Sequence, residues 1–206
     1  MTTTHIELLR HGLPEGDECF RGHTDFLLTS VGFEQMKEAV KGMPFVDLVV
    51  TSPLERCDHF AAYYANKNEL KLIKQPEFME LDFGDWDGQP KQAIWEAHQQ
   101  QLSQFWTQPW TFTPPNGEAI AQYDQRIQIA WTNLLNECKG KKVLLVTHGG
   151  VIKQILRQVL EMPKTSHYLQ RIEIPYAARV TISVFHDDDD TLWPTVHWPT
   201  PPLRAD

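Results

Sequence analysis

The sequence predicts an α/β fold in which helices cover both faces of one sheet, that is, a three-layer αβα sandwich. Short apolar runs typical of buried strands alternate with amphipathic segments typical of helices through most of the 206 residues. Near the end of the chain, two strand-like runs follow one another with no helix between them. We therefore expect a mainly parallel sheet with an antiparallel strand at one edge.

The first part of the chain supplies three of the expected strands and two helices. The strand signals are short β-branched or apolar runs, and the helix signals are apolar residues that recur every three or four positions. Thr29 or Ser30 can cap the first helix, and Ser52 can cap the second with Pro53 as its first residue. The expected strands are 6–9, 48–50 and 70–74, and the expected helices are 30–41 and 53–66.

The rest of the chain supplies longer helices and the strongest strand signal, at 142–146. Residues 78–88 are acidic and contain two glycines, which favours a loop. We interpret residues 83–117 as a helical lid and the proline-rich tail 193–206 as irregular. The other expected helices are 90–108, 118–138 and 151–160, and the other expected strands are 168–174 and 180–185, with a turn at Pro175-Tyr176 between these strands and a solvated turn at 187–190.

Length and composition indicate a single domain over residues 1–206. The net charge of −8 argues against a nucleic-acid surface, and no apolar run approaches the about 20 residues of a membrane span. We see no signal peptide at the N-terminus. The three cysteines show no C-x-x-C pairing, which argues against a disulfide framework or a cysteine zinc site and is typical of the cytoplasm. The oligomeric state stays open, a homodimer included.

Two of the expected strands end in a histidine followed by glycine. One stretch reads Leu8-Leu9-Arg10-His11-Gly12, and the other reads Val146-Thr147-His148-Gly149-Gly150. Open α/β sheets bind ligands at the carboxyl ends of their strands. The two histidines are therefore expected to face each other across one pocket.

The residues near these strand ends are those that phosphoryl transfer requires. Arg10 and Arg56 each follow a short buried strand and can supply planar cationic donors to phosphate oxygens. The helices that begin near Pro53 and after Gly149 would point backbone N–H groups toward the same edge. A neutral His11 imidazole can act as nucleophile, and Glu80 can protonate the leaving oxygen. Two rival readings of this acidic loop stay open: Asp82 as the acid, or a loop that is only solvated.

Four motifs occur in the order found in the histidine phosphatase (phosphoglycerate mutase-like) superfamily, which the chain resembles. The resemblance implies a phosphoglycerate mutase-like fold and a small phosphorylated metabolite as substrate. It also implies that His11 becomes phosphorylated, that Arg10, Arg56 and His148 bind the phosphate, and that Glu80 is the general acid. It implies no metal and no other cofactor. The motifs are Leu9-Arg10-His11-Gly12, Ser52-Pro53-Leu54-Glu55-Arg56, Glu80 through Gly88, and Thr147-His148-Gly149-Gly150.

Two further stretches resemble the alpha-ribazole phosphatase branch, which removes the 5′-phosphate of alpha-ribazole phosphate late in cobalamin assembly. They are Arg21-Gly22-His23-Thr24-Asp25 and Asn116-Gly117-Glu118. By this resemblance, Arg21 and Thr24 are candidate substrate contacts, as is Gly149 beside the second histidine.

The chain also departs from the family. Leu13 to Asp17 stands where many members have Glu-Thr or Glu-Ser and an asparagine, so backbone N–H groups near Gly16 would have to replace side-chain contacts. Asp87 stands where glutamate is common, a change that we expect to be mild.

Other functions remain compatible with the sequence. A phosphoglycerate mutase would return the phosphate to its substrate, and a non-catalytic protein would only bind phosphate, whereas a phosphatase releases it. A histidine and carboxylate metalloenzyme is a more distant reading, which loss of activity in chelator would favour. The tryptophans of the aromatic region could stack on the leaving group or serve as core packing. They are Trp86, Trp95, Trp106 and Trp110.

Overall fold

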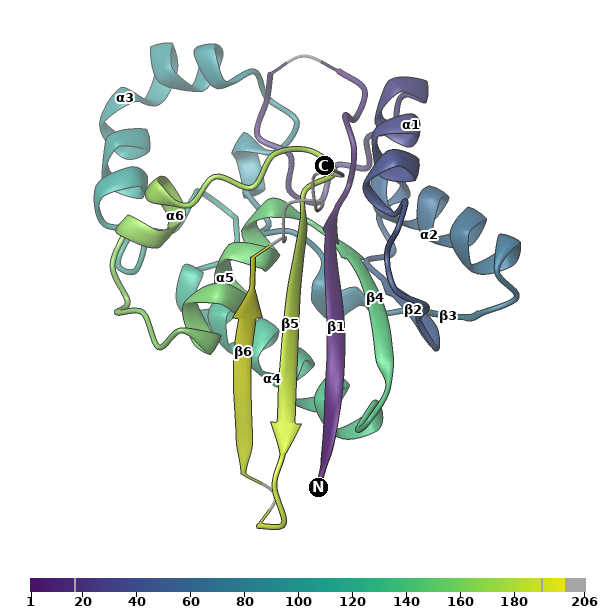
Figure 1. Cartoon of the computed structure of the whole chain (residues 1–206). Coiled ribbons are helices and arrows are strands. Elements are labelled where there is room, and N and C mark those ends of the chain that lie inside the picture. Colours follow the sequence, from purple (N-terminus) through teal and green to yellow (C-terminus); the bar gives the residue numbers. More distant parts are fainter. Residues whose placement is uncertain (17, 190, 199–206) are drawn as a thin grey trace, which may run out of the picture.

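Six strands form one sheet with helices on both of its faces (Figure 1). The computed structural model describes residues 1–16, 18–189 and 191–198. The strands are β1 (Thr2–Arg10), β2 (Leu48–Thr51), β3 (Lys71–Lys74), β4 (Lys142–Thr147), β5 (Arg179–His186) and β6 (Leu192–His197). The helices are α1 (Ser30–Ala39), α2 (Glu55–Lys67), α3 (Lys91–Thr107), α4 (Ile120–Glu137), α5 (Gly149–Val159) and α6 (His167–Arg171), with 3₁₀ turns at Pro76–Phe78 and Gly84–Trp86.

The strand order is β3-β2-β4-β1-β5-β6. Strands β3, β2, β4 and β1 are parallel, and β5 pairs antiparallel with β1 on one side and β6 on the other. The expected mixed α/β sandwich is therefore confirmed. The antiparallel strand β5 is not itself at the edge, because β6 covers it.

The expectation of an irregular tail from residue 193 is wrong for the part that forms β6. Leu192 and Val196 are half-buried and pack on the core, so this short alternating stretch gains a partner in β5. Pro194 is tolerated because the strand lies at the edge of the sheet. The remainder of the predicted tail, 199–206, lies outside the described residues. Asp187 accepts the N–H groups of Asp189 and Thr191, which forms the expected turn.

The expected strand at 168–174 is also wrong, because its first part is α6. Tyr168 and Ile172 are four residues apart, and a short apolar run of this kind does not separate a strand from a helix. Tertiary packing decides the outcome. The Tyr168 ring is buried, and its hydroxyl donates to Oε1 of Gln154 on α5 at 2.6 Å.

The two predicted helix caps have different outcomes. Thr29 caps α1, since its side chain accepts the N–H of Gly32 at 2.9 Å. Ser52 does not cap α2, which begins at Glu55 with Leu54 as its N-cap residue. The hydroxyl of Ser52 instead hydrogen bonds a histidine ring, and an aspartate carboxylate from the 21–25 loop accepts the N–H of Glu55.

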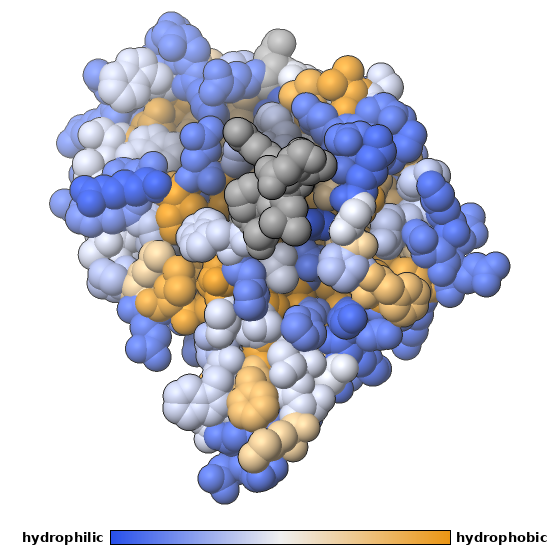
Figure 2. Space-filling model, viewed as in Figure 1, coloured by the Kyte–Doolittle hydropathy of each residue, from blue (hydrophilic) through white to orange (hydrophobic). Residues whose placement is uncertain are grey.

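Side chains from opposite faces of the strands build two cores. Ile6 and Leu8 of β1 point into the larger core with α4 and α5, and Leu9 points into the smaller core with α1 and α2. None of the helices in the described part of the chain is long and apolar enough to cross a membrane. Figure 2 shows hydrophilic residues along the outer borders of the view and hydrophobic ones gathered nearer its middle.

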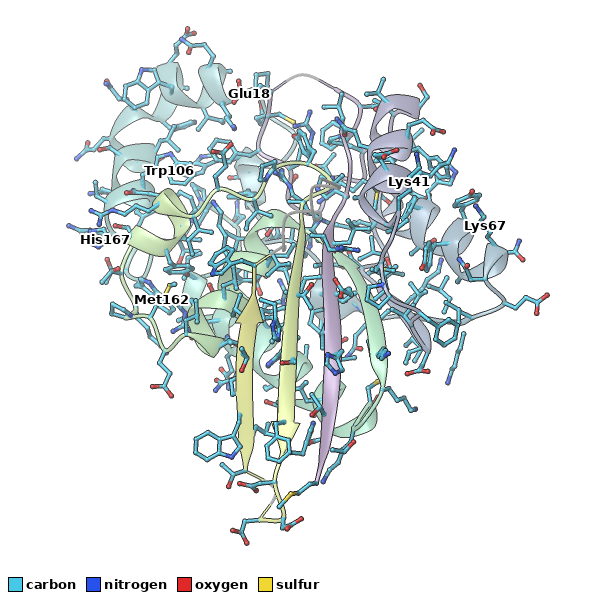
Figure 3. The ribbon with its side chains drawn as sticks, in the orientation of Figure 1. Glu18, Lys41, Lys67, Trp106, Met162 and His167 are labelled. Carbon is cyan, nitrogen blue, oxygen red and sulfur yellow. The ribbon has the colours of Figure 1, made fainter. Side chains whose placement is uncertain are left out.

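Residues 83–117 connect the sheet to α4 and lie beyond the end of β1 (Figure 1). Helix α3 has a kink at His98, and its C-terminal half packs on the larger core through Leu102 and Phe105. Trp106 lies at the end of this helix, on the side of the molecule where Glu18 also lies (Figure 3). The interpretation of this segment as a lid stays a prediction.

The chain leaving β1 passes α1 at a contact between glycines. A Cβ on Gly12 would lie 2.0 Å from the carbonyl oxygen of Gly32, and a Cβ on Gly32 would lie 2.2 Å from that of Leu13. Side chains essentially never approach backbone so closely. The absence of side chains here lets α1 lie against the loop that carries His11.

We expect Gly32→Ala to lower the free energy of unfolding by about 1–3 kcal/mol, although alanine is the better helix former. The backbone oxygen in its way cannot rotate aside, so the helix must shift. Urea unfolding monitored by circular dichroism measures this change. Glu38→Ala, at an exposed position of the same helix, is the control and should change stability by less than about 0.5 kcal/mol. Equal stability of the two variants would contradict the close contact.

Candidate active site

His11 directly follows β1 and is almost fully buried. Its backbone N–H donates to the carbonyl oxygen of Thr147 at 2.9 Å, which continues the pairing of β1 with β4. Its Nδ1 lies 2.8 Å from the carbonyl oxygen of Gly12. A carbonyl oxygen only accepts hydrogen bonds, so Nδ1 carries the proton in this contact. In the neutral ring, Nε2 then holds an unshared electron pair.

Burial keeps the His11 ring neutral. It lowers the pKa of His11 well below the ordinary value, and the positive charges of Arg56 and Arg10 lower that pKa further. Each cause disfavours a second positive charge at this place. The ring is therefore an available nucleophile at neutral pH and not an imidazolium.

His148 lies beside His11 at the end of β4. The two ring centroids are 5.4 Å apart in an edge-on arrangement. Nε2 of His148 hydrogen bonds Oγ of Ser52 at 2.8 Å, and the Cys57 thiol lies 3.6 Å from the same nitrogen. His148 is fully buried, and burial together with Arg56 lowers its pKa well below the ordinary value. Burial raises the pKa of the Cys57 thiol, which therefore stays protonated.

Arg56 is a fully buried arginine in the first turn of α2. Its Nη2 donates to the carbonyl oxygen of Gly22 at 2.6 Å and its Nη1 to that of Thr24 at 3.0 Å. Within the described part of the chain, its Nε–H has no hydrogen-bond partner. Backbone oxygens thus hold the guanidinium without neutralising it, and a donor remains for an anion.

Arg10 lies on the other side of His11. Its guanidinium carbon is 4.1 Å from the centre of the Tyr176 ring, and its Nη1 donates to the carbonyl oxygen of Ile174. Among the described residues, its Nε–H is also without a hydrogen-bond partner. Burial lowers the pKa of Arg10 from its very high ordinary value, but an arginine still carries its charge at neutral pH.

Asp87 holds the backbone of the 21–25 loop from the side opposite Arg56. Its carboxylate accepts the N–H groups of Gly22 and Thr24, each at 3.1 Å, and that of His23 at 2.5 Å. The substitution of aspartate for the more common glutamate thus keeps a working anchor. Arg21 donates to the carbonyl oxygen of Gly16 at 2.8 Å.

Glu80 is fixed by three hydrogen bonds. The Tyr123 hydroxyl donates to Oε1 at 2.8 Å, and the Leu81 N–H donates to the same oxygen at 3.0 Å. The Gly150 N–H, at the start of α5, donates to Oε2 at 2.9 Å. A Cβ on Gly150 would lie 2.2 Å from Oε1, so a side chain at this position would displace the Glu80 carboxylate. Arg126 steadies the loop by donating to the carbonyl oxygens of residues 77 and 79.

Asp82, the rival proton donor, has a local role. Its Oδ1 accepts the Gly84 N–H at 2.8 Å, and its Oδ2 lies 3.7 Å from Nδ1 of His23. Asp82 lines neither the cavity that contains His11 nor the cavity next to it, whereas Glu80 lines both of them. The position of Glu80 therefore favours it as the acid.

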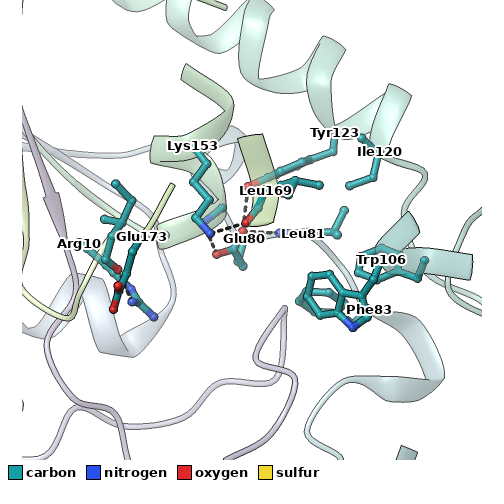
Figure 4. Close-up of a pocket in the computed structure, with 14 residues that line it drawn as sticks. Arg10, Glu80, Leu81, Phe83, Trp106, Ile120, Tyr123, Lys153, Leu169 and Glu173 are labelled. Atoms are coloured by element: carbon teal, nitrogen blue, oxygen red, sulfur yellow. Dashed lines mark hydrogen bonds between the residues drawn. The ribbon is translucent and has the colours of Figure 1, made fainter. Parts of the chain in front are cut away.

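Two cavities meet at Glu80, Arg10, Phe83 and Trp106. The first, of about 460 Å³, reaches His11 and Arg21. The second, of about 290 Å³, passes Gly149 and Lys153 and is drawn in Figure 4. Arg56 and His148 are fully buried and line neither cavity. Thr24 also lines neither, and its side chain lies near Gly88.

The structure brings most of the site residues expected from sequence together. Of the segment that departs from the family pattern, residues 13–16 are described. Leu13 lines the His11 cavity, and Gly16 uses its carbonyl oxygen to hold Arg21. Asp17 lies outside the described residues. Of the four tryptophans, Trp86 is buried in the larger core and Trp106 lines both cavities. Over the ranges that the structure describes, no group of three or more metal-binding side chains is placed to hold a metal ion.

Sequence reasoning missed several residues that hold the site side chains. Ser52 was expected to cap a helix, and Tyr123 lies in the expected helix 118–138 without an assigned role in the site. The spacing of Tyr123 and Arg126, three residues apart on one face of α4, is a signal that could have placed both near one loop. Nothing local to Tyr176, which follows a proline in a turn, indicates that it lies under Arg10.

Comparison with known proteins agrees with this geometry. A model of the histidine phosphatase superfamily (branch 1) matches residues 6–194. The adenosylcobalamin/alpha-ribazole phosphatase of Escherichia coli (strain K12) is 28% identical over 172 residues, which are 81% of this chain and 84% of that protein.

Two solved structures show the shared fold. The alpha-ribazole phosphatase from Shigella flexneri superposes with a TM-score of 0.79 at 23% identity, covering 94% of both chains. The mycobacterial glucosyl-3-phosphoglycerate phosphatase superposes with a TM-score of 0.81 at 21% identity, covering 94% of this chain and 97% of that one.

We expect the neutral His11 to make stability depend on pH. In the unfolded chain a histidine takes up a proton as the pH falls below about 6.5, whereas the buried ring does not. The unfolded state then binds more protons, so the free energy of unfolding falls as the pH is lowered through this range. His11→Gln should reduce this loss by up to about 1.4 kcal/mol per pH unit. The measurement is urea unfolding at several values from about pH 7 to about pH 5.

The control for this experiment is His167→Gln, because His167 is exposed at the start of α6. Its slope of stability against pH should match that of the wild type. A wild-type slope that His11→Gln leaves unchanged would mean that the ring is protonated in the folded protein.

Proposed function

The chain belongs to the histidine phosphatase superfamily, and from that premise we propose that it is a phosphomonoester hydrolase acting through a phosphohistidine at His11. The observation that carries the proposal is the state of this ring. Its Nδ1–H is held by the Gly12 carbonyl oxygen, and its pKa is lowered by burial and two arginines. An unprotonated Nε2 in a positive field is a nucleophile placed where a phosphate dianion would bind.

In the first step, Nε2 of His11 attacks phosphorus in line with the ester oxygen. A nitrogen–phosphorus bond forms and the phosphorus–oxygen bond of the ester breaks. Glu80, where the two cavities meet, gives its proton to the departing alkoxide, which leaves as an alcohol. Arg10, which lines both cavities, donates to the nonbridging oxygens, and the buried Arg56 stabilises the charge on them through its positive field.

In the second step, a water molecule takes the place of the alcohol. Glu80, now ionised, removes a proton from the water as its oxygen attacks phosphorus. The nitrogen–phosphorus bond breaks, orthophosphate leaves, and His11 and Glu80 return to their starting states. The bond from Tyr123 holds the carboxylate in the same place for both steps. No step calls for a metal ion or another cofactor.

For the substrate, we propose alpha-ribazole 5′-phosphate, whose hydrolysis yields alpha-ribazole. The support is the Escherichia coli relative at 28% identity and the aromatic wall of the second cavity. Another small phosphorylated metabolite is the second candidate, since the mycobacterial phosphatase named above shares the fold. With either substrate, the location that we propose for the protein is the cytoplasm.

We expect the purified protein to release orthophosphate from alpha-ribazole 5′-phosphate in the presence of a chelator, and His11→Ala to lose this activity. Alanine removes the only atom that the mechanism lets attack phosphorus. A panel of other phosphomonoesters in the same assay ranks the substrates by kcat/KM. Acid-labile label on the protein from a ³²P-labelled ester reports the phosphohistidine.

The control is His167→Ala, at an exposed position, which should retain wild-type rates. Release from other esters but not from alpha-ribazole phosphate would keep the chemistry and reject the substrate. Phosphate that passes to an acceptor without release would favour a mutase. Activity that survives His11→Ala would reject the nucleophile, and a wild type that binds phosphate without turnover would favour the non-catalytic alternative.

Glu80→Gln separates proton donation from the rest of the mechanism. Glutamine keeps the size of the side chain and can still accept from Tyr123, but it has no proton to give. We expect kcat to fall by about 10²–10⁴-fold with an alkyl phosphate, whose leaving group needs a proton. With 4-nitrophenyl phosphate, whose phenolate leaves without one, phosphorylation of His11 should slow much less. Stopped-flow release of nitrophenolate measures this step, and equal losses with both esters would reject Glu80 as the acid.

A further inference from the structure

The second cavity has a charged end and an apolar end, with Glu80 between them. Figure 4 shows Arg10, Glu173 and Lys153 on one side of Glu80, and Phe83 and Trp106 on the other. Glu80 and Arg10 also line the cavity that contains His11, so they mark where the ester oxygen lies. The second cavity opens from this point, so it is the place that we assign to the leaving group.

Lys153 is a positively charged residue at the charged end of the cavity, and the proposed phosphate chemistry gives it no role. It lies on α5, four residues after Gly149, and therefore on the same helix face. Its Nζ donates to the carbonyl oxygen of Leu169 at 2.7 Å. The side chain is half-buried, and burial lowers the pKa of its ammonium group. An ammonium group has three donors, so a bound molecule can accept those that Leu169 does not use.

Glu173 supplies the opposite polarity at the same end. It lies in the chain that follows α6, its side chain is exposed, and it lines the cavity with Lys153. Its negative charge acts on Lys153 and raises the pKa that burial lowers. A donor and an acceptor that line the same end of a cavity match hydroxyl groups, because each hydroxyl both donates and accepts a hydrogen bond. Two adjacent hydroxyls would satisfy both side chains.

The apolar end is a cluster of aromatic rings. The centroids of Phe83 and Phe105 are 6.0 Å apart, and those of Phe105 and Trp106 are 5.1 Å apart. Trp106 is 38% exposed, so part of its ring is available to a ligand. Such a wall favours a planar group through stacking and burial of apolar surface.

We propose that Lys153 and Glu173 determine specificity by binding vicinal hydroxyls on the sugar of the leaving alcohol, while the Phe83 and Trp106 wall takes a planar ring beyond them. The substrate class is a ring-bearing glycoside phosphorylated on its sugar. The inference rests on the proposed function, because Glu80 and Arg10 locate the ester oxygen only if phosphate binds at His11. It adds the two residues that distinguish such an ester from one without hydroxyls.

The test compares adenosine 5′-monophosphate with its 2′,3′-dideoxy analogue, which keeps the planar base and lacks both hydroxyls. We expect the wild type to prefer the diol ester by at least about 10-fold in kcat/KM, as expected for lost hydrogen bonds to charged groups. Lys153→Met should bring this preference to within about threefold of unity, and the exposed Glu173→Gln should reduce it in the same direction. The ratio, not the absolute rate, is the readout, so a general loss of activity does not imitate the effect.

Lys67→Met is the matched control, since Lys67 is an exposed lysine at the end of α2, and it should keep the wild-type ratio. A wild-type ratio near one, or a ratio that survives both Lys153→Met and Glu173→Gln, overturns the inference. Phenyl phosphate in the same assay tests the proposed function separately, because it needs neither residue. If the wild type hydrolyses no ester, the proposed function fails.

Binding of the alcohols tests the cavity without turnover. Isothermal titration of adenosine and of 2′,3′-dideoxyadenosine, each in the presence of orthophosphate, reports the same preference. Tighter binding of adenosine that disappears in Lys153→Met supports the assignment. Equal binding of the two nucleosides to the wild type contradicts it.

Discussion

The parallel register of β1 and β4 is the constraint on which the site depends. Arg10 pairs with Thr147 at the ends of these strands, so the next residues, His11 and His148, leave the sheet side by side. Core side chains on both faces lock this register, because a slip by one residue would turn each of them to the opposite face. The N–H of His11 continues the pairing by one bond, and the Gly12 carbonyl oxygen fixes the ring beyond it. A backbone arrangement thereby sets which imidazole nitrogen is available.

Although the net charge of the protein is −8, the charges of Arg10 and Arg56 make the surroundings of His11 positive. Arg56 is fully buried, and removing a guanidinium from water is costly unless polar groups replace the water. Carbonyl oxygens of the 21–25 loop do so, and Asp87 holds the N–H groups of the same loop from the other side. Dipoles stabilise the charge without cancelling it, which a carboxylate partner would do. The same field and the same burial keep both histidines neutral, so in the proposed mechanism the cations would stabilise the bound anion and also keep the nucleophile unprotonated.

The strand ends were predictable from sequence because their signal is local. Arg10, His11 and His148 follow apolar runs directly, and the order of the motifs implied a common pocket. What the sequence did not reveal depends on contacts between distant elements. Tyr123 hydrogen bonds Glu80, which is 43 residues away in the sequence, and Ser52 hydrogen bonds His148, which is 96 residues away. The residues next to these side chains in the sequence do not indicate either contact. The wrong strand at 168–174 has the same origin, since the burial of Tyr168 against α5 decided between two conformations that a short apolar run allows.

The two cavities of the site are lined by different segments of the chain. The His11 cavity is lined by the end of β1, by residues 11–16 and 18–21 after it, and by Glu80, and the pairing of β1 with β4 fixes where the two histidine-bearing strands end. The second cavity is lined by α3, by the chain after α6 and by the side chain of Lys153 on α5, and the segment that contains α6 is the one where tertiary packing overrides the local signal. A substitution there changes the lining without disturbing the register of β1 and β4. Chemistry and specificity are thus held by different physical constraints, so relatives can share phosphohistidine chemistry while binding different alcohols.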